Sequence, residues 1–200
     1  MSNSMAKQFD NSMMKEGTRR MHPKKFGLWL FMASVVMMFG GFTSAYIVRQ
    51  AEGNWLIFEL PTLFYYSTVV ILLSSITMHI ALHYAKQDKL DLLKIFITVT
   101  SLLGVAFLIL QVQGWKELMA VDINFGGENA NPSGSFLYVL TGVHGAHILS
   151  GLIVLAFTLI AVFQYKVHSK RLTRIQMCAT YWHFLDFLWI YLFIFLLLNR

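Results

Sequence analysis

The sequence predicts an all-α fold, an integral membrane bundle of five transmembrane helices. Of the 200 residues, 56% are hydrophobic and only 13% are charged, whereas soluble domains average about 45–50% apolar and about 25% charged residues. There is too little charge to cover a water-facing surface, and the hydrophobicity is too high for disorder. The net charge of +6 is explained by membrane orientation, so nucleic-acid binding is not expected. A single cysteine, Cys178, excludes a disulfide framework and a thiolate zinc site.

Five long stretches nearly free of charged residues predict the helices. A membrane-spanning helix needs about 20 apolar residues to cross a hydrocarbon core about 30 Å thick, and the spans are expected at 26–48, 61–85, 94–115, 135–165 and 175–198. The fourth uncharged stretch is expected to be shortened by Pro132-Ser133-Gly134, so that this span begins at about residue 135. Residues 1–20 are expected to form a polar, mobile tail without a cleavable signal peptide, and residues 21–200 a single membrane domain.

The distribution of basic residues predicts the orientation. Of the 16 Lys and Arg residues, all but Arg49, Lys116 and Arg200 lie before the first span or in the second and fourth connections. Basic residues concentrate on the cytoplasmic side of membrane proteins. The N-terminus is therefore predicted to be cytoplasmic and the C-terminus to lie on the outer side.

Ionisable residues within the spans are the first candidates for function, because such groups are costly at membrane depth. His144 and His147 are three residues apart on one helix face, beside the small residues Gly142 and Gly145. His183 and Asp186 have the same spacing in the last span, next to Trp182. Counted along the helices, His147 and Asp186 both lie near the middle of the membrane, at depths of roughly 18 and 16 Å. The fourth and fifth spans are therefore expected to pack antiparallel, with Asp186 paired to His144 or His147.

Three roles are open for this cluster on the residues alone. The histidines have the chemistry of haem or metal ligands, and with Asp186 they have that of a proton relay in a stand-alone cytochrome or proton-linked transporter. The third role is structural, either packing or a pocket for a lipid headgroup. We favour it because a single acidic residue within five spans is too few for ion-coupled transport. Two further histidines in the second span, His79 and His83, are read as a hydrogen-bonding group and an interfacial group.

A second group of titratable residues falls on the predicted cytoplasmic side. These residues can collect protons, although an ordinary wetted surface is the simpler interpretation: His22, His83, Asp88, Asp91 and His168.

Two motifs resemble subunit III of the haem–copper terminal oxidases. The segment from Ser135 through Thr141-Gly142-Val143-His144-Gly145-Ala146-His147 to Gly151 is similar to one signature of that family. The segment Tyr181-Trp182-His183-Phe184-Leu185-Asp186 with Trp189 is similar to another. Weaker similarities lie in Leu72–Thr77, in Phe39-Gly40-Gly41, and at Gly104, Phe107 and Gln111. The chain resembles the short, five-helix form of the family, and it departs from many members in having Val35 where a carboxylate follows Ser34.

The resemblance implies an accessory, non-catalytic subunit of a proton-pumping respiratory oxidase in the bacterial cytoplasmic membrane. Haem and copper are then expected in partner subunits and none in this chain, which packs against catalytic subunit I in a complex with subunit II. The family holds phospholipid, and the resemblance makes packing and lipid-pocket residues of His144, His147, His183, Asp186, Trp182, Gly142 and Gly145. The electron donor is expected to be cytochrome c, with quinol as the alternative.

Overall fold

The structure is a computed structural model that describes residues 23–127, 131–163 and 172–199. Its described part contains five long α-helices, each long and apolar enough to cross a membrane. They are α2 (Pro23–Ala51), α3 (Thr62–Lys86), α4 (Leu90–Ala120), α5 (Pro132–Phe163) and α6 (Thr173–Leu198). The chain is therefore a multi-pass membrane protein with five spans, as the sequence predicts, and the predicted tail over residues 1–20 lies outside the described residues.

Proline marks where three of these helices begin. The chain has three prolines; Pro23 and Pro132 are the first residues of α2 and α5, and Pro61 immediately precedes α3. Proline suits a helix start because its missing N–H would have no partner there. The expectation that the fourth span begins only after Pro132-Ser133-Gly134 is therefore wrong, since this segment forms the first turn of α5.

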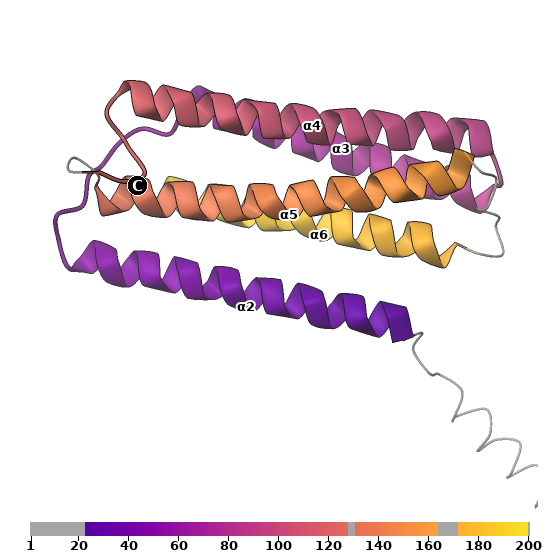
Figure 1. Cartoon of the computed structure of the whole chain (residues 1–200), viewed down its shortest axis with the longest axis horizontal. Helices are drawn as coiled ribbons and strands as arrows, with labels where there is room; N and C mark the ends of the chain where they lie inside the picture. The colour runs from indigo at the N-terminus through magenta and orange to yellow at the C-terminus, as the bar shows by residue number, and fades with distance from the viewer. Residues whose placement is uncertain (1–22, 128–130, 164–171, 200) are drawn as a thin grey trace, which may run out of the picture.

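Four of the helices form a compact bundle, and the fifth lies at its edge. Helices α3, α4, α5 and α6 pack in a ring in which each contacts two neighbours, while α2 contacts α5 and α6. Figure 1 shows α2 lying along one side of the bundle, with successive helices running in opposite directions. The predicted antiparallel packing of 135–165 against 175–198 is confirmed by α5 and α6.

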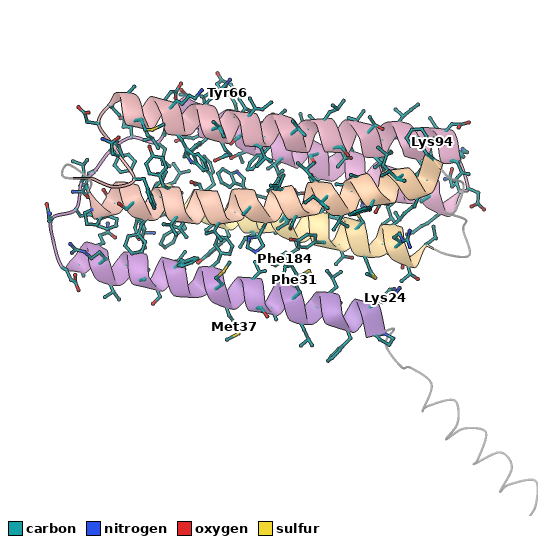
Figure 2. All side chains as sticks on the ribbon, viewed as in Figure 1. Lys24, Phe31, Met37, Tyr66, Lys94 and Phe184 are labelled. Carbon is teal, nitrogen blue, oxygen red and sulfur yellow. The ribbon has the colours of Figure 1, made fainter. Side chains whose placement is uncertain are left out.

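Helix α2 buries only a narrow stripe of side chains. Its buried residues recur every three or four positions: Met32, Val35, Phe39, Thr43 and Tyr46. In Figure 2, Phe31 lies on the side of α2 that faces the bundle, whereas Met37, which is 78% exposed, points away. Most of the surface of α2 therefore faces outward.

Candidate functional site

The middle of α5 carries a histidine enclosed by aromatic rings. His144 is completely buried, and its ring centroid lies 5.2 Å from that of Trp189, 5.9 Å from that of Phe107 and 6.5 Å from that of Phe39. Neither ring nitrogen has a hydrogen-bond partner among the described residues. The His144 ring thus lies between side chains of α2, α4 and α6, and its two nitrogens are unsatisfied among the described residues.

His147 lies one turn further along α5 and faces α2. Its Nδ1 donates a hydrogen bond to the carbonyl oxygen of Val143 at 2.8 Å, so its ring is fixed by its own helix. Phe39 and Phe31 contact the ring from α2, with centroids 5.9 and 6.4 Å away. His144 and His147 therefore do share a helix face, and Phe39 is packed against both.

The predicted pairing of Asp186 with His144 or His147 is wrong. Asp186 is 2% exposed, and neither carboxylate oxygen has a hydrogen-bond partner in the described part of the chain. Its nearest ionisable neighbour is His183 on its own helix, with 3.8 Å between Nδ1 and Oδ2. Leu185 fills the side of α6 that faces Gly151 on α5. Successive side chains of a helix point about 100° apart, so Asp186 does not share the direction of Leu185.

His183 connects this carboxylate to α3. The Oγ of Ser75 and the Nδ1 of His183 are 2.7 Å apart and share one hydrogen bond. The His183 ring also lies beside that of His79, with 6.3 Å between centroids. Ser75, His79, His183 and Asp186 therefore form a polar cluster between α3 and α6, separate from the histidines of α5.

Indole N–H groups bind hydroxyl oxygens on neighbouring helices. Trp182 donates to Ser74 Oγ at 2.7 Å, and Trp189 donates to Thr68 Oγ1 at 2.9 Å, so two bonds run from α6 to α3. A buried tryptophan usually finds such a partner for its polar edge. Together with the bond between His183 and Ser75, these contacts fix the position of α6 against α3.

The glycines of the motifs differ in how closely their neighbours approach them. A Cβ atom on Gly142 or Gly145 would meet only ordinary contacts at 3.8 Å, from Trp115 and Leu108. A Cβ on Gly104 would lie 2.7 Å from Trp182, and one on Gly151 would lie 2.9 Å from Leu185. The tight approach to α6 is therefore provided by Gly104 and Gly151, whereas Gly142 and Gly145 make contacts of ordinary length.

The predicted proton-collecting residues are only partly described. His83 is exposed and lies 2.8 Å from the amide nitrogen of Gln87, while Asp91 forms an exposed ion pair with Lys94 at 3.5 Å. Asp88 lies between these residues in the short α3–α4 connection. His22 and His168 lie outside the described residues. His79, read as a hydrogen-bonding group, is exposed and contacts the ring of His183.

Several further hydrogen bonds join side chains of different helices and were not predicted from the sequence. Gln111 donates to Ser67 between α4 and α3, Trp115 donates to Thr141 between α4 and α5, and Tyr181 shares a bond with Ser150. The signal available in the sequence was the tryptophan or glutamine itself, since each needs a partner at membrane depth. Over the described ranges, no three His, Cys, Asp or Glu side chains gather as they would around a metal ion.

Comparison with known proteins relates this chain to one protein family. The family model for cytochrome c oxidase subunit III matches residues 54–199, which contain all of α3–α6. A protein of Buchnera aphidicola named "Cytochrome bo(3) ubiquinol oxidase subunit 3" is 30% identical over 181 residues, covering 88% of this chain and 86% of the relative.

Two staphylococcal relatives carry the name "Probable quinol oxidase subunit 3". The protein of Staphylococcus saprophyticus is 29% identical, covering 84% of this chain and 85% of the relative. The protein of Staphylococcus aureus strain USA300 is 27% identical, with 92% of each chain covered. Because the family model and the relatives match most of the chain, whose described part has five candidate spans, the chain belongs to the family of subunit III of the haem–copper terminal oxidases, in its five-helix form.

Proposed function

We propose that this chain is the non-catalytic subunit III of a quinol-oxidising haem–copper terminal oxidase. The observation that carries the proposal is the agreement of three relatives, each named as a quinol oxidase subunit 3, over 84–92% of the chain. The sequence favoured cytochrome c as the donor, and these relatives favour the quinol alternative. In this function the chain packs against catalytic subunit I, and subunit II completes the core complex. The haem and copper are held by these partner subunits.

The interior of the bundle supports a scaffolding role. Trp182, Asp186 and His144 are at most 2% exposed, and polar side chains of the interior mostly bond from helix to helix. Side chains buried to this degree are not accessible to a bound lipid. We therefore assign Trp182, Asp186 and His144 to packing, and phospholipid to surfaces at the edge of the bundle.

Cytochrome c oxidation is the second candidate, because the matching family model is described as cytochrome c oxidase subunit III. The donor is tested on the complex purified through a tag on this chain. Oxygen consumption with a ubiquinol analogue and none with reduced cytochrome c is the expected result. Activity with cytochrome c alone, together with a copper-binding cysteine motif in the co-purified subunit II, would reverse the choice of donor.

The proposed location is the bacterial cytoplasmic membrane, with the N-terminus in the cytoplasm. All three curated relatives described above are bacterial. The described basic residues near the start of α2, in the α3–α4 connection and at the start of α6 lie at one end of the bundle (Figure 1). The gathering of these basic residues at one end of the bundle supports the orientation predicted from the positive-inside rule.

At that same end we place the proton-collecting surface, whose described members are His83, Asp88 and Asp91. Replacement of Asp88 and Asp91 by asparagine and of His22, His83 and His168 by glutamine is expected to slow turnover of the complex at high pH, where protons are scarce. Measurement of oxygen consumption against pH tests this expectation. Identical pH profiles for the variant and the wild type would leave these residues as an ordinary wetted surface.

A further inference from the structure

A cavity of about 350 Å³ opens at the end of the bundle where α2 and α6 begin and α3 ends. Its polar lining consists of Lys25 from α2, Lys86 from α3, and Gln176 and Thr180 from α6. None of the seven packing and lipid-pocket residues that the motifs suggested lines this cavity. It is therefore a site of its own, lined by residues of α2, α3 and α6.

The charge of the cavity is positive. Lys25 donates a hydrogen bond to the Oε1 of Gln176 at 3.2 Å, which holds its ammonium group at the cavity wall. Lys86 lies in the last turn of α3 and also lines the space, and none of the residues that line it is acidic. The first turns of α2 and α6 add the partial positive charge of two helix N-termini. An anion is the ligand that these groups would stabilise.

The remainder of the lining is apolar and leads into the membrane. Its apolar lining consists of Leu28, Trp29, Leu82 and Met177. Thr180 lies seven residues into α6, which corresponds to a depth of roughly 10 Å along the helix. The space thus joins a cationic rim at the membrane border to an apolar wall below it. This combination fits an amphiphile with an anionic head and hydrocarbon chains better than it fits a free anion.

We infer that this cavity binds an anionic phospholipid of the cytoplasmic leaflet, with the phosphate between Lys25 and Lys86. The inference deepens the lipid binding of the proposed function, because it names the site and the charge of the headgroup. The glycerol region lies near Thr180, and the acyl chains follow Leu28 and Leu82 along the apolar wall of the cavity. Bound in this way, the lipid joins the loosely packed α2 to the four-helix bundle.

The test counts lipids on the assembly that purifies with this chain. The tagged assembly is delipidated in mild detergent and titrated with phosphatidylglycerol, with phosphatidylcholine or with inorganic phosphate, and bound lipid is counted by native mass spectrometry. The test variant is Lys25→Gln with Lys86→Gln. The matched control is Lys24→Gln with Lys89→Gln, which removes the same charge at the same end of the bundle from residues that do not line the cavity.

We expect the wild type and the control to retain phosphatidylglycerol in preference to phosphatidylcholine. The test variant should bind phosphatidylglycerol roughly thirtyfold more weakly, the effect of two basic charges at a membrane surface. A photoactivatable phosphatidylglycerol should label peptides that contain Leu28 or Leu82 in the wild type and control only.

Three results would overturn the inference. Equal weakening in the test variant and the control would show general surface attraction, equal binding of the two lipids would remove the role of the headgroup charge, and competition by inorganic phosphate at equal concentration would identify a free anion as the ligand. Because the lipid is counted on whatever assembly purifies, these results leave the subunit assignment intact. The subunit assignment fails separately, if no haem-containing partner purifies with the chain.

Discussion

Two glycines face the indole of Trp182, and they limit which residues α4 and α5 can place there. A Cβ on Gly104 would lie 2.7 Å from Cη2 of Trp182, closer than real contacts allow. Gly104→Ala should therefore destabilise the chain by about 1–3 kcal/mol through overpacking. The measurement is the midpoint of SDS-induced unfolding of the detergent-solubilised chain, followed by circular dichroism.

Gly40→Ala is the matched control for that substitution. Gly40 lies within α2, and a Cβ there would meet nothing within 4 Å. The control should leave stability unchanged or raise it by about 1 kcal/mol, because alanine favours the helix more than glycine. If both variants unfold at the same midpoint, the close packing around Trp182 is not what Gly104 provides.

The hydrogen bond from Trp182 Nε1 to Ser74 Oγ, at 2.7 Å, gives a second prediction at this scale. Ser74→Ala removes the acceptor, Trp182→Phe removes the donor, and the double variant closes a mutant cycle. The coupling energy should be about 0.6 kcal/mol, and at most about 1.7 kcal/mol, the range found for hydrogen bonds between membrane helices. The same unfolding assay measures it, and purely additive single effects would mean that the bond contributes nothing.

At the residue scale, the sequence predicts which side chains are unusual better than it predicts their partners. Asp186 and His144 are recognisable because polar groups are rare at membrane depth, and both are buried. Their pairing was not predictable, because it depends on the rotation of α6 about its own axis. In the structure the nearest ionisable neighbour of Asp186 is His183 on the same helix, and neither carboxylate oxygen has a hydrogen-bond partner among the described residues.

Among the elements, α2 is the helix whose attachment depends on the fewest contacts. Phe39, which is 1% exposed, packs on the rings of His144 and His147. Phe39→Ala should therefore loosen α2 while the four-helix bundle stays folded. Spin labels on α2 and α6 would report a broader distance distribution in the variant. Met37→Ala on the exposed side of the same helix is the control, and it should leave the distribution unchanged.

The ends and the packing of elements differ in how far the sequence predicts them. Uncharged stretches predict five helices because charge in hydrocarbon is costly, and the helices exceed most of these stretches because terminal polar residues reach the interface. Proline suits the first position of a helix, which explains why α5 starts at Pro132, whereas the sequence pattern suggested a start near residue 135. The loose position of α2 could not be predicted, because its length and hydrophobicity resemble those of the other spans.

For the whole molecule, the orientation can be tested by labelling single cysteines in intact cells. Cys178 is 3% exposed and should react slowly, so cysteines introduced as Lys89→Cys and Gly126→Cys report on the two ends of the bundle. A membrane-impermeant maleimide added from outside should label position 126 and leave position 89 unlabelled until the membrane is permeabilised. Labelling in the reverse pattern would place the N-terminus outside and contradict the positive-inside argument.

The sequence predicts five spans joined by short connections. Short connections place successive helices side by side in antiparallel directions. The role in a larger assembly follows from the motifs of α5 and α6 and from the family match over residues 54–199. The assay for the electron donor is performed on the assembled complex.

The most direct test of the subunit assignment is purification of the chain from its native membrane through a C-terminal tag in mild detergent. The reduced-minus-oxidised spectrum of the product and the identities of the co-purifying chains are recorded together. We expect a large multi-span catalytic subunit, subunit II and the bands of a haem–copper oxidase. A chain that purifies alone and shows a Soret band would make its histidines haem ligands, and a colourless chain without partners would favour an independent membrane transporter; either result would contradict the assignment.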